Sequence, residues 1–283
     1  MIISSPHHPI VVLGASGKTG RRVVERLRAR DLPVRLGSRT GEPPFDWQDP
    51  ATWRPVLEGG SAAYISYFPD LAAPGAPEAI DALAGIAVEA GVGRLVLLSG
   101  RGETEAQRSE VALRRSGAEW TVVRASWFAQ NFSEGHFRAP LLAGELALPA
   151  GDAGEPFVDA DDIADVAVAA LTEDGHAGEV YEVTGPRLLT FAEAVGEIAR
   201  ASGRDLRYTT IGIEDFGAGL AAEGVPEEEI GLLSYLFTEV LDGRNAHLTD
   251  GVERALGRPP RDFADFAWAA AANGAWGAER VGA

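Results

Sequence analysis

The segment from residue 14 to residue 20, Gly-Ala-Ser-Gly-Lys-Thr-Gly, constrains the fold more than any other part of this chain. It follows the short apolar run 10–13, which predicts a buried strand. It also opens residues 18–30, whose apolar side chains recur at helical spacing. The first glycine permits a tight turn, the second lets a ligand approach the backbone, and the third lets the helix pack closely. This order predicts a phosphate site at the amino end of a helix, the alternative being a glycine-rich turn that binds nothing.

The first half of the chain alternates short apolar runs with helical patterns. Such alternation predicts an α/β fold with a doubly wound parallel sheet of the Rossmann type, covered by helices on both faces. Beyond the first strand and helix, we expect strands at 33–38, 45–47, 62–66, 94–99 and 120–124, and helices at 77–90 and 105–115.

The alternation breaks after about residue 125. Residues 159–171 and 226–276 have mostly helical patterns, residues 179–183 predict a strand, and Thr190 with Glu193 forms the capping-box pattern of a helix start. We therefore expect an NAD(P)-binding Rossmann domain at residues 1–150 and a smaller α/β substrate lobe at residues 151–283. Some elements of the lobe are expected to return to the first sheet, and the lobe to cover the carboxyl ends of its strands.

Composition excludes several classes of protein and site. The chain has no cysteine, which excludes disulfides, thiolate metal sites and a cysteine nucleophile. A net charge of −17 argues against nucleic acid and anionic membranes as partners. No apolar run approaches a membrane span of about 20 residues, and no signal peptide is recognisable, so we expect a cytoplasmic protein acting on a small molecule. The sequence does not indicate an oligomeric state.

No metal site is expected. The acidic residues Asp159, Asp161 and Asp162 resemble a metal cluster, but they precede an apolar helix. N-capping and compensation of the helix dipole explain them better than metal binding.

The end of the second predicted strand indicates which dinucleotide binds. An acidic residue at this place would bind the ribose hydroxyl of NAD and repel the phosphate of NADP. This chain has Ser38 and Arg39 there, and an arginine can bind a phosphate through two hydrogen bonds. Lys18 can add positive charge from the glycine-rich loop. NADP(H) is therefore expected in preference to NAD(H), unless Arg39 is only a solvated loop residue.

The sequence lacks the tyrosine–lysine pair of the common short-chain dehydrogenases. None of the five tyrosines is followed by a lysine four residues later, and Lys18 is the only lysine. Two interpretations remain open. The protein is either a reductase whose substrate needs little acid catalysis, such as an iminium ion, or a sensor that binds the cofactor without catalysis.

Long stretches of the chain resemble the NmrA-like atypical short-chain dehydrogenases, and among them the ergot-alkaloid reductase branch, which includes festuclavine and agroclavine dehydrogenases. The resemblance implies NADPH-dependent reduction of cyclic iminium species in secondary metabolism. The matching stretches are residues 14–20, 34–39, 45–47, 94–99, 121–134, 156–164 and 257–263.

Candidate site residues follow the carboxyl ends of the predicted strands. Tyr67 and Ser99 are the candidate proton donors, the alternatives being packing for the tyrosine and a local cap for the serine. The candidate substrate pocket comprises Trp127, Phe128, Asn131 and His136, although the two aromatic residues can equally be core. The candidate cofactor-binding residues are Gly14, Ser16, Gly17, Lys18, Thr19, Gly20, Ser38, Arg39, Asp46, Trp47, Ser66, Tyr67, Ser99, Gly100, Ala125 and Ser126.

Overall fold

The computed structural model describes residues 8–277, which divide into two compact units. The first unit contains the described residues up to Ala125, together with Ala160–Val183 and Asp250–Arg258. The second unit contains Ser126–Asp159, Thr184–Thr249 and the described residues from Pro259 onward. We expected a boundary at residue 150 with some later elements returning to the first sheet, whereas the units are interleaved along the chain and residue 150 lies inside the second unit.

The boundary differs because three elements from the second half of the chain complete the first unit. Helix α7 (Ala160–Thr172) packs on α1 (Lys18–Ala29), and α11 (Gly251–Leu256) packs on α7. Strand β7 (Glu179–Val183) pairs in parallel with β5 (Glu119–Ala125). Most residues of α7 are buried, so its apolar face needs the sheet of the first unit to cover it.

A six-stranded parallel sheet forms the centre of the first unit, in the order β2-β1-β3-β4-β5-β7. The short apolar strands β1 and β3 are buried along their whole length, as expected of parallel strands covered on both faces. The direction of winding reverses beside β1, and ligands of such sheets bind outside the carboxyl ends at this point. Besides β5 and β7, the strands of this sheet are β1 (Ile10–Leu13), β2 (Val34–Gly37), β3 (Ala62–Ile65) and β4 (Arg94–Gly100).

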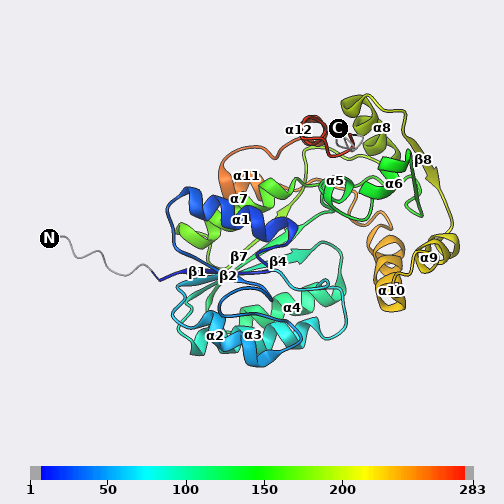
Figure 1. Ribbon diagram of the computed structural model, residues 1–283. Helices are drawn as coiled ribbons and strands as arrows, with labels where there is room; N and C mark the ends of the chain where they lie inside the picture. The colour runs from blue at the N-terminus through cyan, green and yellow to red at the C-terminus, as the bar shows by residue number, and fades with distance from the viewer. Residues whose placement is uncertain (1–7, 278–283) are drawn as a thin grey trace, which may run out of the picture. The chain divides into compact units, whose positions relative to one another are not determined.

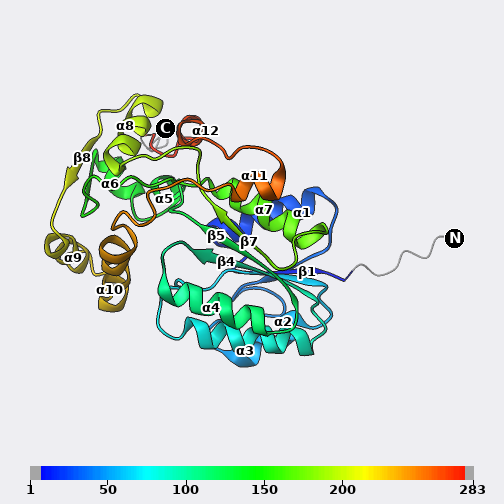
Figure 2. The same cartoon turned by 180° about the vertical axis from the view of Figure 1, so that it is seen from behind.

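Helices cover both faces of this sheet, as Figures 1 and 2 show. One face carries α1, α7 and α11, and the other carries α2, α3 and α4. The α/β class and the doubly wound sheet predicted from the sequence are confirmed. The helices of the second face are α2 (Trp53–Leu57), which follows a short 3₁₀ turn at Pro50–Thr52, α3 (Ala76–Glu89) and α4 (Thr104–Arg115).

The strand expected at residues 45–47 is wrong. Local turns satisfy the backbone there instead of a sheet ladder: the carbonyl oxygen of Asp46 accepts hydrogen bonds from Asp49 N and from the indole of Trp53. The Asp46 side chain also accepts from Gln48 N, a turn typical of aspartate. Residues 45–47 form only an isolated antiparallel bridge, between Asp46 and Asp49. Because they do not pair with the main sheet, β2 is the strand at its edge.

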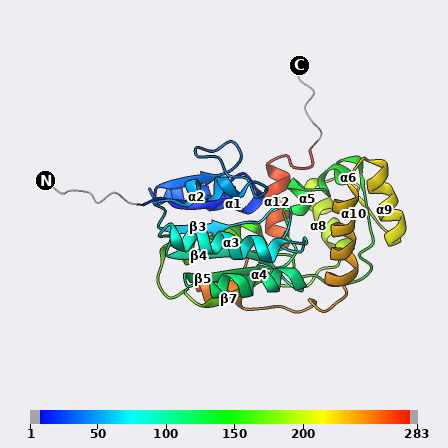
Figure 3. The ribbon, with the colours of Figure 1, turned by 90° about the horizontal axis from the view of Figure 1, so that it is seen from below.

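The second unit combines helices with a small parallel sheet of two strands, β6 and β8. Sequence analysis did not predict these strands. The predicted capping box is confirmed at the start of α8, where Thr190 and Glu193 bond to each other's backbone N–H groups. Figure 3 shows α9 and α10 side by side. The elements are α5 (Asn131–Glu134), α6 (Arg138–Ala143), β6 (Glu145–Leu148), α8 (Phe191–Ser202), β8 (Arg207–Thr210), α9 (Ile213–Ala222), α10 (Glu227–Tyr235), a π-helical turn (Leu236–Val240) and α12 (Phe263–Ala272).

Candidate functional site

The glycine-rich loop between β1 and α1 has the geometry that its sequence predicts. Gly14 has a φ of +78°, which strongly favours glycine, and Gly17 N donates to Gly14 O at 2.9 Å. A Cβ atom built at Gly20 would lie 2.1 Å from the carbonyl oxygen of Gly14. Because this oxygen belongs to the backbone, α1 can approach the loop only with glycine at position 20.

The amino end of α1 suits an anion. Its N-cap is Gly17, which offers no side chain to the first-turn N–H groups, and the first turn contains no acidic residue. A Cβ atom at Gly17 would meet only Gly14 O within 4 Å, so glycine leaves space in front of the helix. First-turn N–H groups and the positive end of the helix dipole bind phosphates. The loop therefore fits the diphosphate of a dinucleotide.

The loop after β2 presents a cation to the solvent. Arg39 is exposed and forms no hydrogen bond or ion pair within residues 8–277. A tight turn precedes the next segment, because Ser38 O accepts from Gly41 N at 3.0 Å and from Phe45 N at 2.9 Å. The Arg39 guanidinium is thus available to a phosphate group.

Three connections meet beside the glycine-rich loop. A Cβ atom at Gly14 would lie 3.1 Å from Ser66, so the loops after β1 and β3 are in close contact. The indole of Trp47 donates to Ser66 O at 3.2 Å, and its ring packs edge-on against Tyr67 at 4.8 Å between centroids. Burial and the nearby Glu78 carboxylate raise the pKa of Tyr67, so its phenol stays protonated at neutral pH. The structure therefore brings together the candidate residues Gly14, Trp47, Ser66 and Tyr67.

Ser99 takes part in a network of ionic hydrogen bonds at the carboxyl end of β4. Its hydroxyl donates to the buried Glu110 carboxylate at 2.8 Å, and Arg124 binds both oxygens of Glu110 at 2.6 and 2.9 Å. Arg124 and Arg101 in turn bind Glu182 on β7. The Ser99 hydroxyl is thus engaged by the protein, although its partner is a side chain on α4 and not the local backbone that a cap would use. The candidate Ala125 ends β5 nearby, where its carbonyl accepts from Arg101 N at 3.1 Å.

A pair of carboxyl groups beside Gly100, one from the buried Glu103 and one from the partly buried Asp70, was not predicted from the sequence. Glu103 and Asp70 hydrogen bond to each other, and a Cβ atom at Gly100 would lie 2.0 Å from the Glu103 carboxyl oxygen. Burial, and then the Asp70 carboxylate, raise the pKa of Glu103 well above its ordinary value. No local pattern signals this pair, because its members lie on different loops. Glu110 gave a signal that was overlooked: it lies one helical turn from Ala106, on the buried stripe of α4.

The candidate substrate residues lie in the second unit. Trp127 is partly buried and contacts the rings of Phe137, Phe191 and Phe237, with centroid distances of 6.4, 5.6 and 5.1 Å. Those three phenylalanines are buried and were not among the predicted residues. Trp127 thus packs against the aromatic core of the second unit and remains partly exposed.

The other candidates of the second unit are less closely grouped. Phe128 forms an isolated parallel bridge with Val158, and Asn131 N donates to Phe128 O at 3.0 Å as α5 begins. Ser126 is buried. His136 is mostly exposed, and its ring lies 3.5 Å from the Glu229 carboxylate. Within residues 8–277, His136 and Trp127 share no hydrogen bond, ion pair or ring contact.

The acidic residues that resemble a metal cluster are engaged by polar side chains of the protein. Asp161 pairs with Arg26 of α1 at 2.6 Å, and Asp162 pairs with Arg258 at 2.8 Å. Asp159 accepts a hydrogen bond from Gln130 at 2.7 Å. In the part of the chain that the structure describes, no group of three or more histidine, aspartate and glutamate side chains is arranged to hold a metal ion. Across the same residues, no helix is both long and apolar enough to cross a membrane.

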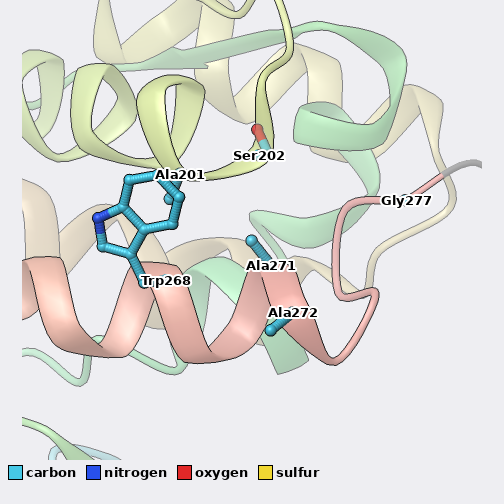
Figure 4. A pocket seen from close by; sticks show the side chains of 6 residues that line it. All are labelled: Ala201, Ser202, Trp268, Ala271, Ala272 and Gly277. Atoms are coloured by element: carbon cyan, nitrogen blue, oxygen red, sulfur yellow. The ribbon is translucent and has the colours of Figure 1, made fainter.

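A groove between α8 and α12 of the second unit contains none of the candidate residues (Figure 4). Its volume is about 290 Å³. Small residues form most of its lining, and Trp268, which is 60% exposed, forms one wall. The lining residues are Ala201, Ser202, Trp268, Ala271, Ala272 and Gly277.

Comparison with known proteins identifies the family. A family model described as NAD(P)H-binding matches residues 14–174. The chain is 31% identical to the NAD(P)H azoreductase of Xenophilus azovorans over 93% of this chain and 98% of that protein. It is also 31% identical to the agroclavine dehydrogenase of Claviceps fusiformis, over 91% of this chain and 95% of that protein.

This chain belongs to the NAD(P)H-binding, NmrA-like family of oxidoreductases. The resemblance inferred from the sequence motifs is confirmed. The fold of this oxidoreductase is also that of the Citrobacter sp. triphenylmethane reductase solved with NADP(H), with a TM-score of 0.74 and 19% identity over 93% of this chain and 99% of that chain.

Proposed function

We propose that this NmrA-like oxidoreductase transfers hydride from NADPH to a small cyclic or aromatic electrophile, at an iminium, activated C=C or C=O group. When bound, NADPH supplies the hydride. The aromatic group around Trp127 carries the substrate part of the proposal. A partly exposed indole supported by three buried phenylalanine rings offers a flat, rigid and apolar face.

The preference for NADPH rests on Arg39. The structure offers an exposed guanidinium directly after β2, in a loop that has no carboxylate at the position where NAD enzymes bind the ribose. A guanidinium binds a phosphate through charge-assisted hydrogen bonds, whereas it gains little from a ribose hydroxyl. NADPH is therefore expected to bind more tightly than NADH.

Positioning supplies most of the catalysis in this proposal. Hydride addition to an iminium carbon yields a neutral amine, so no negative charge develops on the substrate and no strong proton donor is needed. Holding two reactants in the correct geometry alone lowers a barrier substantially. This matches a chain without the tyrosine–lysine pair.

A ketone or quinone makes a different demand, because its oxygen becomes negative and needs a proton. Tyr67 is the best placed donor. Its hydroxyl forms no hydrogen bond within residues 8–277, and its raised pKa keeps it protonated. Ser99 is less suited, because its hydroxyl hydrogen already points to Glu110.

A substrate screen tests the proposal. Cyclic iminium ions, azo compounds, enones, quinones and ketones are incubated with NADPH, and cofactor oxidation is followed for the wild type, Tyr67→Phe and Ser99→Ala. Tyr181→Phe is the matched control, because it removes a phenol that bonds to His176. We expect iminium ions to be reduced, with kcat nearly unchanged in all three variants.

Two other outcomes of this screen would change the proposed function. A loss of about 100-fold or more in Tyr67→Phe, with turnover confined to ketones, would replace the iminium substrate by a carbonyl and make Tyr67 the acid. Tight NADPH binding with no oxidation by any compound would instead favour a cofactor-binding regulator.

A further inference from the structure

The carboxyl pair Asp70–Glu103 connects two loops of the first unit. Asp70 lies in segment 66–75, which runs from β3 to α3, and Glu103 lies between β4 and α4. The Glu103 carboxyl group folds back onto Gly100, where a Cβ atom would lie 2.0 Å from its oxygen, so a larger residue at this position would displace the carboxyl group. Asp70 also begins a turn, because its carboxylate accepts from Ala72 N at 2.8 Å and its carbonyl oxygen accepts from Ala73 N at 3.0 Å. The hydrogen bond between the two carboxyl groups thus ties segment 66–75 to the end of β4.

Two carboxyl groups can hydrogen bond to each other only when one of them carries a proton. Among the described residues, no arginine, lysine or histidine forms an ion pair with Asp70 or Glu103. Arg101 and Arg124, the nearby cations, bind Glu182 and Glu110.

The groups that face the pair decide when its proton leaves. Asp70, from segment 66–75, and Glu110, from α4, both oppose a negative charge on Glu103. The amino end of α4, which begins at Thr104, favours a negative charge on Glu103. Burial is the largest influence, and it raises the pKa of both carboxyl groups.

Segment 66–75 also carries two candidate cofactor contacts. Ser66 and Tyr67 begin the segment, and Trp47 contacts both of them through its indole N–H and its ring. Movement of the segment would therefore change the surroundings of Trp47 as well as the candidate cofactor site.

We propose that a proton shared by Asp70 and Glu103 latches segment 66–75 onto the end of β4, and that the latch opens when base removes this proton. Loss of the proton leaves two adjacent carboxylates, one buried and one partly buried, without a cation, and their repulsion separates the loops. NADPH affinity should then fall as pH rises. This last consequence rests on the proposed function, because it requires Ser66 and Tyr67 to lie at the cofactor.

The latch has a direct readout in the cofactor-free protein. The wild type, Glu103→Gln and Asp70→Asn are labelled with 5-fluorotryptophan, and the Trp47 resonance is assigned with Trp47→Phe. Spectra are recorded from about pH 6 to pH 9, below the raised pKa of Tyr67. Asp81→Asn is the matched control, because it removes an exposed carboxylate from α3.

We expect the Trp47 resonance to titrate in the wild type and in Asp81→Asn, and to stay constant in Glu103→Gln and Asp70→Asn. An amide in either position keeps a hydrogen bond to the remaining carboxylate and removes one charge. A constant resonance in the wild type, or an unchanged titration in both amide variants, would overturn the latch.

Cofactor titrations with NADPH over the same pH range separate this inference from the proposed function. We expect the Kd to rise with pH by about tenfold for each unit by which binding shifts the pKa of the pair, and to rise less in Glu103→Gln. If NADPH does not bind at any pH while the Trp47 resonance still titrates, the proposed function fails and the latch stands. If NADPH binds with the same pH dependence in the wild type and Glu103→Gln, the effect of the latch on affinity is refuted.

Discussion

At the scale of single residues, Arg39 differs from the other arginines that this structure pairs with carboxylates. Arg26, Arg124 and Arg187 each bind acidic partners, and these contacts raise the pKa of their guanidinium groups. Arg39 is exposed and has no partner within residues 8–277. In a chain with a net charge of −17, a cation without an acidic partner at the end of β2 suits an anionic ligand.

Substituting Arg39 by alanine should therefore change cofactor preference rather than stability. Hydrogen bonds to charged groups contribute about 1.5–3 kcal/mol, so we expect NADPH affinity to fall by roughly 10- to 150-fold. NADH affinity should change little. Calorimetric titration of both cofactors measures the ratio, and Arg108→Ala, which removes an exposed arginine from α4, is the control. An unchanged NADPH/NADH ratio in Arg39→Ala would remove Arg39 from the site.

Site residues differed in how far they were predictable from sequence. The glycine-rich loop is encoded locally, by three glycines whose spacing fixes a turn and a helix start, and its conformation was predicted correctly. The pair Asp70–Glu103 was not predictable, because only the pairing of β3 with β4 brings its two loops together. The rings around Trp127 come from α8 and from the residues beside α6 and α10, so no sequence spacing relates them.

At the scale of elements, two helices of the first unit contain a glycine, and replacing it with alanine should have opposite effects on stability. Gly20 lies in α1 against the backbone of Gly14, whereas a Cβ atom at Gly85 in α3 would meet nothing within 4 Å. Alanine is a better helix former than glycine wherever it fits.

Paired substitutions test this difference. We expect Gly85→Ala to raise the free energy of unfolding by up to about 1 kcal/mol. Gly20→Ala should lower it by several times that amount and abolish NADPH binding, because α1 must move away from the loop. Urea denaturation and cofactor titration measure both effects. Equal stability of the two variants would contradict the close approach of α1.

Asp262 caps α12 and also holds a cation. Its carboxylate accepts from Ala264 N at 2.8 Å, and it binds Arg187 through two hydrogen bonds of 2.7 and 2.8 Å. The Arg187 guanidinium, above all, lowers the pKa of Asp262. A lowered pKa means that the unfolded chain takes up the proton first as pH falls, so this stabilisation is present above about pH 3.8 and is lost in acid.

Two substitutions of Asp262 should therefore separate cap from charge. Asparagine keeps the cap, and since Arg187 is 37% exposed we expect a cost of at most about 1 kcal/mol at neutral pH, vanishing in acid. Alanine loses the cap as well, with a further cost of about 1 kcal/mol that persists in acid. Urea denaturation at neutral and acidic pH measures both. A loss in Asp262→Asn that does not depend on pH would show that the ion pair does not stabilise the unit.

The elements themselves were predictable in proportion to their periodicity. Strands of the main sheet are continuous apolar runs, and they were located within a few residues. Strands β6 and β8 were missed because they are short, contain no continuous buried run and pair only with each other. The false strand at 45–47 is apolar enough, but Asp46 organises turns around it. Local hydrogen bonding therefore prevailed over apolar pattern.

At the scale of the whole molecule, the chain combines a strongly negative net charge with an anionic cofactor. The long-range field of a protein with a charge of −17 opposes the approach of an anionic dinucleotide, whereas in the proposed function Arg39 and the amino end of α1 hold NADPH once it is bound. Salt screens the long-range field before it affects close contacts, because the screening length falls from about 30 Å at 0.01 M to about 8 Å at 0.15 M.

Ionic strength should therefore raise both rate constants of NADPH binding, with opposite effects on affinity. We expect the association rate constant to rise between about 0.01 and 0.15 M salt, because repulsion is screened, and the dissociation rate constant to rise as contacts to Arg39 weaken. NADH, which carries less negative charge, should show a smaller rise in association. Stopped-flow fluorescence measures both constants. An association rate constant that falls with salt would mean that local positive charge, and not the net charge of the molecule, governs the approach of the cofactor.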